Sequence, residues 1–132
     1  MIMIRTARPS LVSVRLLEEQ TLAGAVLVAA CHTDLGEPNE RQAGYYPPSG
    51  GEWKWDEIRT SANGNIVLLH SDDDPFIPIE EPRHIARALG PPSVLRECKG
   101  ESHFFGPSEQ IYEAVIAVVD AAEQAAAREI NY

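Results

Sequence analysis

The stretch from Asn65 to Pro78, NIVLLHSDDDPFIP, constrains the fold more than any other part of the chain. Its four apolar residues, Ile66 to Leu69, follow an Asn-Gly pair and precede three consecutive aspartates, Asp72 to Asp74. A short apolar run bounded in this way is typical of a strand buried on both faces of a parallel sheet. The aspartates then stand at the carboxyl end of the strand, where open α/β sheets keep their functional sites.

A second polar loop, GESHFF at residues 100–105, follows about one helix and one strand later and carries His103. A carboxylate and an imidazole on successive strand-end loops are two of the three members of a nucleophile–base–acid triad. The sequence therefore predicts an acid–base site at the carboxyl edge of the sheet, and the missing member is the nucleophile.

Apolar runs and helical spacing divide the rest of the chain into alternating strands and helices. We expect strands at 1–4, 25–30, 65–71 and 93–98, and helices at 8–20, 53–58, 79–89 and after Gly106-Pro107. Residues 31–52 show no clear periodicity and are expected to form a loop. Strand–helix alternation with short turns predicts an α/β three-layer sandwich with a mostly parallel sheet of three to four strands per chain.

Length and charge restrict the class of protein. The 132 residues suit one domain, and a formal net charge of −9 argues against nucleic acid and anionic membranes as partners. The apolar run from Ala23 to Cys31 is about half a membrane span, and the two cysteines, Cys31 and Cys98, show no metal-ligand spacing. We expect a cytoplasmic protein without a cofactor or a metal.

Four segments that follow one another in unbroken order carry a family resemblance: AVLVAACHTDLGEPNERQAGYY, WKWDEI, SDDDPFIP and SHFF. They resemble the small serine hydrolases related to retinoblastoma-binding protein nine, which have the α/β-hydrolase fold. The resemblance runs from about residue 15 onward. It implies that Asp74, directly before Pro-Phe, is the acid of the triad and that His103 is the base. It also implies a small ester or amide as the ligand.

The chain departs from this family at the nucleophile. The family's serine lies in a Gly-x-Ser-x-Gly turn between a short apolar strand and a helix. Here that turn falls on residues 5–9, so Ala7 takes the nucleophile position, and Arg5 and Pro9 take the positions of the glycines. We expect the parts that the family carries before this strand, including an oxyanion loop, to be missing from this chain. Residues 1–132 are therefore expected to be a single truncated, partial α/β-hydrolase domain.

Two functions follow from this departure. One is a hydrolase that keeps Asp74 and His103 but lacks the nucleophile, and is weakly active or inactive unless Ser10 or a partner-supplied serine replaces it. The other is a non-catalytic module that binds a small molecule or a protein on a degenerate hydrolase fold. Whether the chain is an enzyme is left open at this point.

Several polar and aromatic residues have a structural interpretation as well. Asp72 and Asp73 are expected to be solvated turn charges, although three aspartates with His70 or His103 leave a divalent-metal site as an alternative. No further ligand motif supports that alternative. Three histidines are expected to be incidental: His32, His70 and His84. Trp53 and Trp55 are expected to pack in the core, with pocket lining as the other interpretation.

The first strand has a consequence for assembly. Hydrolases of this fold have strands on both sides of the nucleophile strand, whereas the strand at residues 1–4 lacks one set of neighbours. A parallel edge strand presents unpaired N–H and C=O groups that invite pairing with another chain. We therefore expect a homodimer through the edge strand at residues 1–4, with a two-fold axis. The alternative is a gene fragment of marginal solubility.

Overall fold

Four parallel strands form the centre of the protein, in a computed structural model that describes residues 2–6, 10–47 and 52–131, with side chains from residue 14 onward. The strands are β1 (Ile2–Thr6), β2 (Gly24–Val28), β3 (Ile66–Ser71) and β4 (Val94–Cys98). They lie in the order β1-β2-β3-β4, and each pairs in parallel with its neighbour. The predicted parallel sheet is confirmed, with four strands.

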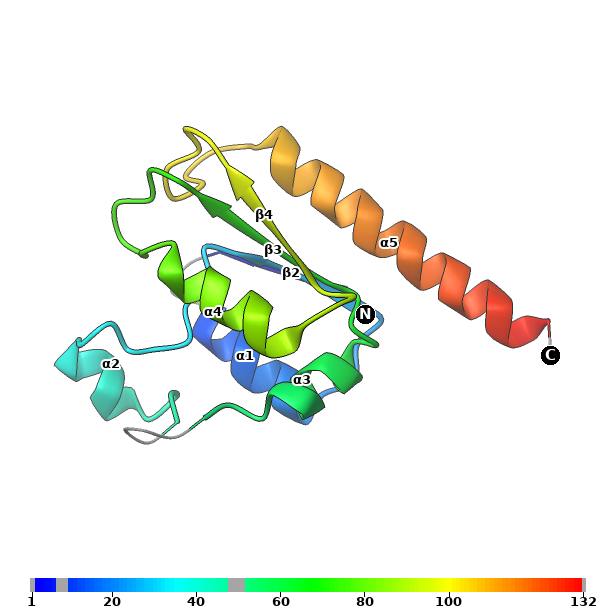
Figure 1. The fold of residues 1–132 in the computed structure, drawn as a ribbon, viewed down its shortest axis with the longest axis horizontal. Helices are drawn as coiled ribbons and strands as arrows, with labels where there is room; N and C mark the ends of the chain where they lie inside the picture. The colour runs from blue at the N-terminus through cyan, green and yellow to red at the C-terminus, as the bar shows by residue number, and fades with distance from the viewer. Residues whose placement is uncertain (1, 7–9, 48–51, 132) are drawn as a thin grey trace.

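Helices cover both faces of this sheet and make three layers, as the sequence predicts. One face is covered by α1 (Ser10–Glu19), α3 (Trp55–Ser61) and α4 (Glu80–Leu89), and the other by α5 (Glu109–Ile130) (Figure 1). The two cores that result contain alternate residues of the same strands. Leu27 and Leu68 belong to the first core, and Val26 and Val67 belong to the second.

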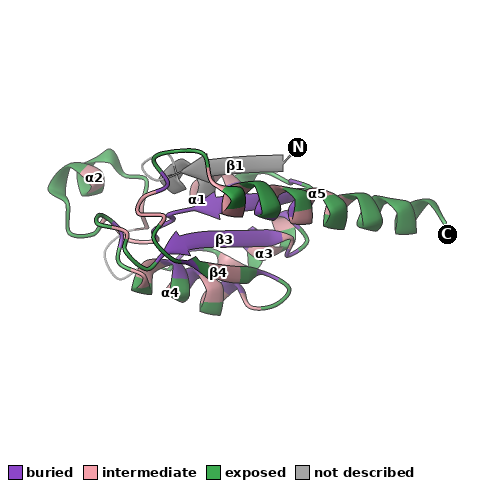
Figure 2. Ribbon diagram, turned by 90° about the horizontal axis from the view of Figure 1, so that it is seen from above, coloured by how far each residue is buried: buried purple, intermediate pink, exposed green. Residues whose placement is uncertain are grey.

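Burial explains the apolar runs of the two central strands. Every residue of β2 and β3 is buried, because each strand has a neighbour on either side and helices on both faces (Figure 2). Residues of β4 are mostly exposed or half-buried, and β4 lies at an edge of the sheet. The sequence at residues 93–98 is correspondingly more polar than those of β2 and β3.

One element contradicts the sequence analysis. Residues 31–52 were expected to form a loop, but α2 (Pro38–Ala43) forms within them. Local features stabilise this short helix: Pro38 stands in its first turn, and Gly44 ends it in the left-handed conformation with φ 73°. None of its residues is buried, so the helix leaves no apolar periodicity in the sequence.

Helix α5 confirms the predicted C-terminal helix and extends beyond the sheet (Figure 1). Its first half packs through Ala114 and Val118, while every residue from Glu123 to Asn131 is exposed. Asn65 Nδ2 donates hydrogen bonds to the carbonyl oxygens of Val118 and Ala23, which fastens the helix to the sheet. Among the described residues, no helix is both long and apolar enough to cross a membrane.

Replacing Leu68 tests whether β3 is the centre of the core. Its side chain is 0% exposed and belongs to the core under α1, α3 and α4. Leu68→Ala should lower the free energy of unfolding by about 2–5 kcal/mol, because the change removes buried methyl groups and leaves a cavity. Urea titration followed by circular dichroism measures this. Val94→Ala on the edge strand, where the side chain is 45% exposed, is the control, and an equal loss in both variants would contradict this account of the core.

Candidate active site

The carboxyl ends of β3 and β4 bring together the two loops that the sequence singles out. Ser71, the last residue of β3, is in register with Cys98, the last residue of β4. The pairing continues one residue further, because Asp72 N–H donates to the Cys98 carbonyl oxygen over 2.9 Å. The aspartate loop (residues 72–79) and the histidine loop (residues 99–108) therefore begin at the same level of the sheet.

Asp74 and His103 are joined by a hydrogen bond. His103 Nδ1 lies 2.8 Å from Asp74 Oδ2, and the side chains are 11% and 1% exposed. An ionised carboxylate only accepts, so Nδ1 carries the proton of this bond. The other carboxylate oxygen, Oδ1, accepts from the backbone N–H groups of Phe76 at 2.8 Å and Ile77 at 2.9 Å. The two residues that the resemblance marks as acid and base are thus brought together.

The rest of the aspartate loop holds the histidine loop by a set of hydrogen bonds. The N–H groups of Gly100, Glu101 and Ser102 donate to Asp72 Oδ1 at 3.3 Å, Ser71 Oγ at 2.9 Å and Asp73 Oδ1 at 2.9 Å. Asp72 and Asp73 are exposed, as expected for turn charges, but their role as backbone acceptors was not foreseen. The N–H groups that they accept from lie almost thirty residues away in the sequence, so no local sequence pattern predicts these hydrogen bonds.

Asp73 is stabilised in its charged form by two of these contacts. Ser71 Oγ donates to Asp73 Oδ1 over 2.6 Å, and this bond with that from the Ser102 N–H lowers the pKa of the Asp73 carboxyl below its usual value. Ser102 and Phe104 adopt left-handed backbone conformations with φ 52° and 54°, on either side of His103. Such conformations cost energy outside glycine, and the bonds from the aspartate loop offset that cost.

Two exposed phenyl rings pack against His103. The ring centroids of Phe76 and Phe105 lie 5.0 and 5.5 Å from that of the imidazole, and the phenyl rings meet each other edge to face. Both are exposed large hydrophobic residues. His103 Nε2, the ring nitrogen away from Asp74, has no hydrogen-bond partner among the described residues. The imidazole ring of His103 therefore lies beside an apolar surface.

The nucleophile position cannot be placed in the same way, because Ala7 and Pro9 lie outside the described residues. The structure describes the elements on either side of them: β1 ends at Thr6 and α1 begins at Ser10. Arg5 and Thr6 extend the strand by two residues beyond the expected end at residue 4. A strand followed within a few residues by a helix is the context that the nucleophile turn requires.

Two of the histidines that were expected to be incidental stack on each other. The rings of His32 and His84 are 4.0 Å apart at an interplanar angle of 10°. Glu81 contacts the loop that carries His32: its Oε2 is 3.7 Å from His32 Nε2 and accepts from the backbone N–H groups of His32 and Thr33. Burial lowers the pKa of His32 below its usual value. This contact fastens the loop after β2 to α4.

His70, the third histidine that was expected to be incidental, contacts the backbone near Asp74. Its side chain is completely buried, and Nε2 lies 2.8 Å from the carbonyl oxygen of Ile77, in the loop that carries Asp74.

Trp53 packs as expected: it is buried, and its Nε1–H donates to the His32 carbonyl oxygen. Among the described residues, no group of three His, Cys, Asp or Glu side chains is placed to hold a metal ion.

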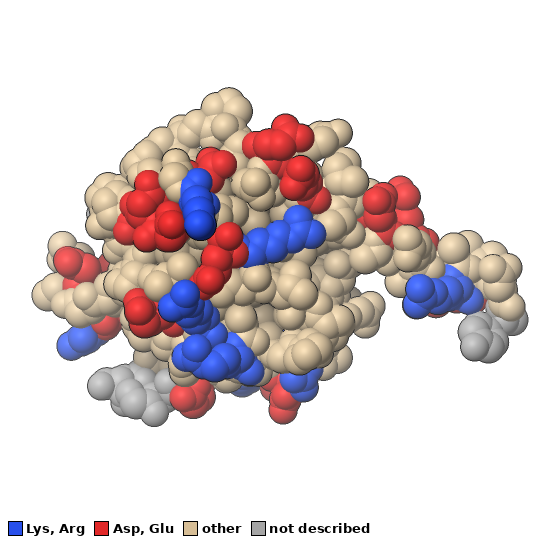
Figure 3. Space-filling view, turned by 45° about the horizontal axis from the view of Figure 1, so that its top comes forward, with Lys and Arg blue, Asp and Glu red and all other residues tan. Residues whose placement is uncertain are grey.

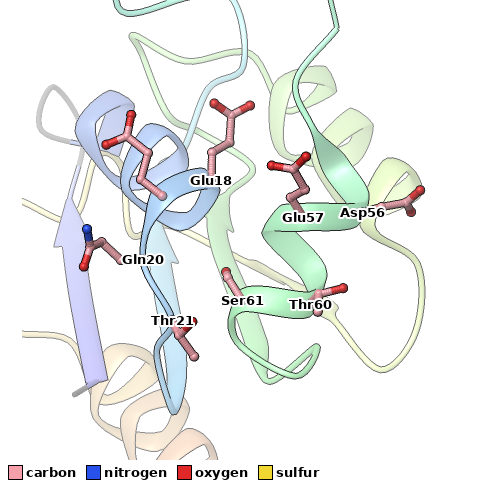
Figure 4. A pocket seen from close by; sticks show the side chains of 8 residues that line it. Glu18, Gln20, Thr21, Asp56, Glu57, Thr60 and Ser61 are labelled. Carbon is pink, nitrogen blue, oxygen red and sulfur yellow. The ribbon is translucent and has the colours of Figure 1, made fainter.

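Charges elsewhere on the surface are mixed. On the face that Figure 3 presents, Lys and Arg lie among Asp and Glu and form no basic stripe. A hollow of about 540 Å³ lies between α1 and α3 (Figure 4), and neither Asp74 nor His103 lines it. Its lining is mainly acidic and hydroxylic: Glu18, Glu19, Gln20, Thr21, Asp56, Glu57, Thr60 and Ser61. None of these residues is an expected site residue.

Comparison with known proteins supports the resemblance. The chain is 32% identical over 88 residues to the serine hydrolase RBBP9 of Rattus norvegicus, a match that covers 67% of this chain and 45% of the rat protein. The fold matches the crystal structure of the ydeN gene product from B. subtilis, with a TM-score of 0.72 at 19% identity over 90% of this chain and 65% of that one. No protein-family model matches.

These matches confirm the resemblance to small serine hydrolases and the α/β fold. The chain spans less than half of the rat relative's length, so the activity of that whole protein is not carried over to it.

The His32–His84 stack predicts how stability depends on pH. Because burial holds the pKa of His32 below its ordinary value of 6.5, the unfolded chain binds more protons as the pH falls through that value. The free energy of unfolding should therefore be highest above about pH 7 and decrease toward about pH 5.5. Urea titrations at several pH values measure the slope, which should be smaller in His32→Gln. An identical slope in that variant would contradict the assignment.

Proposed function

We propose that this chain carries the acid and base of a serine hydrolase-like site, with Asp74 as the acid and His103 as the base, and lacks the serine nucleophile. The observation that carries the proposal is the 2.8 Å hydrogen bond between His103 Nδ1 and Asp74 Oδ2. Burial of the Asp74 side chain strengthens that bond, because a low local dielectric weakens the competition from water. The similarity to serine hydrolases over 67% of the chain supports the same roles.

The proposed reaction is slow general-base hydrolysis of a small ester or amide. His103 Nε2 accepts a proton from a water as its oxygen bonds to the carbonyl carbon, and Asp74 stabilises the imidazolium that forms. The tetrahedral intermediate then expels the alcohol or amine, which takes the proton from Nε2. General-base catalysis alone supplies about 10²–10⁴-fold, far less than an acyl-enzyme route with an oxyanion hole.

The alternative is a non-catalytic module that binds a small molecule or a protein. The identity of residue 7 favours it, because the alanine methyl group at the position matched to the nucleophile has no oxygen to attack a carbonyl. The exposed rings of Phe76 and Phe105 offer such a module an apolar contact surface. Ser10, or a serine from a partner, is the remaining source of a nucleophile.

Hydrolysis of a short-chain p-nitrophenyl ester separates the two functions. If His103 is a working base, His103→Ala should lower the rate by about 10²-fold or more. His84→Ala is the matched control, because it removes a histidine that does not contact Asp74, and it should keep the wild-type rate. Circular dichroism verifies that both variants are folded. Equal rates in wild type and His103→Ala would leave the binding module as the function.

We also propose that the protein is cytoplasmic. The thiols of Cys31 and Cys98 are free and buried, which suits a reducing compartment. Burial raises the pKa of Cys31 to about 11, so this thiol is protonated and unreactive at neutral pH.

A homodimer through β1 is the assembly that we propose. β1 is at the end of the strand order and pairs with β2 alone among the described strands, which leaves one row of backbone groups for another chain. Joining two sheets about a two-fold axis satisfies those groups in both copies at once.

Sedimentation velocity over a concentration series tests this assembly. The dimer should dominate at micromolar concentration, and Met3→Pro together with Ile4→Pro should shift the protein to monomer, since proline removes backbone donors from β1. A wild type that sediments only as a monomer at that concentration would rule the dimer out.

A further inference from the structure

His70 occupies a position in β3 that normally holds an apolar side chain. Successive residues of a strand point to opposite faces, so His70 lies on the same face as Ile66 and Leu68, which belong to the core under α1, α3 and α4. Its side chain is 0% exposed. Burying an imidazole in such a layer is unfavourable unless its polar atoms find partners.

The hydrogen bonds of the ring define its state. Nε2 lies 2.8 Å from the Ile77 carbonyl oxygen, and a carbonyl only accepts, so the proton is on Nε2. Nδ1 is buried and has no partner among the described residues. A proton on Nδ1 would therefore be an unsatisfied donor, which makes the neutral Nε2–H form the one that the surroundings accommodate.

Ile77 connects this imidazole to the candidate acid. Its carbonyl oxygen accepts from His70, and its N–H donates to Asp74 Oδ1 over 2.9 Å. Asp74 Oδ2 in turn accepts from His103. His70 Nε2 is 4.0 Å from Asp74 Oδ2, beyond hydrogen-bond distance, so the connection passes through the Ile77 backbone.

We propose that His70 is a positioning residue: its Nε2–H holds the Ile77 carbonyl, and thereby sets the turn in which Asp74 receives the Phe76 and Ile77 N–H groups and faces His103. The proposal rests on the proposed roles of Asp74 and His103. A merely space-filling His70 would need only the volume of its ring. A positioning His70 needs a donor at the place of Nε2.

Three substitutions distinguish these two roles. His70→Phe keeps the ring volume and removes the donor. His70→Gln places an amide N–H near the position of Nε2, whereas His70→Asn places one near Nδ1 and does not reach the Ile77 carbonyl. Amide hydrogen exchange at Phe76 and Ile77, measured by NMR, reports whether the turn around Asp74 is held.

Exchange at both amides should rise about two- to tenfold in the Phe and Asn variants, the range expected for loss of one hydrogen bond, and stay near wild type in the Gln variant. Unchanged exchange in the Phe and Asn variants, or an equal rise in all three, would overturn the proposal. If His70→Phe does not fold, the difference between the Gln and Asn variants decides.

Ester turnover in the same variants separates this proposal from the proposed function. If wild type turns over ester through His103, the rate should fall in the Asn variant and be retained in the Gln variant. If wild type has no turnover, the catalytic proposal fails, while the exchange rates still test the role of His70.

Discussion

The parallel pairing of β3 with β4 is the constraint on which the candidate site depends. Register between Ser71 and Cys98 starts the two loops at the same level, so an aspartate three residues after one strand meets a histidine five residues after the other. Neither loop has a helix or strand of its own to fix it. Instead, the side chains of Ser71, Asp72 and Asp73 accept hydrogen bonds from backbone N–H groups of the second loop, those of Gly100, Glu101 and Ser102. The register of the sheet brings the two loops close together, and these bonds fix the orientation of His103.

The carboxylate of Asp74 is nearly inaccessible to solvent and accepts three hydrogen bonds, two from backbone N–H groups and one from His103. Hydrogen bonds to a charged group contribute about 1.5–3 kcal/mol each, and an ionised carboxylate without them does not persist in a buried site. The same bonds leave His103 Nε2 as the basic atom of the pair. The loops after β3 and β4 thus hold a hydrogen-bonded Asp74–His103 pair, to which the proposed function gives the roles of acid and base.

The sequence predicts most of this fold because burial leaves a local pattern. Strands β2 and β3 are buried along their length and appear as apolar runs, and the aspartates directly follow β3. His103 follows β4, an edge strand with a more polar sequence. Helix α2 was missed because it buries nothing. His70 and the His32–His84 stack were judged incidental because their partners, the Ile77 carbonyl and Glu81, are recognisable only in the folded chain. The family resemblance, rather than periodicity, selected Asp74 among three aspartates.

The most direct test of the account is the protonation of the His103 ring. NMR of protein with ¹⁵N-labelled histidine distinguishes the two neutral forms of an imidazole through the shifts of Nδ1 and Nε2. The account predicts a proton on Nδ1 of His103 at neutral pH, in a hydrogen bond that is lost in Asp74→Ala. A proton on Nε2 in the wild type, or an unchanged His103 spectrum in Asp74→Ala, would contradict it.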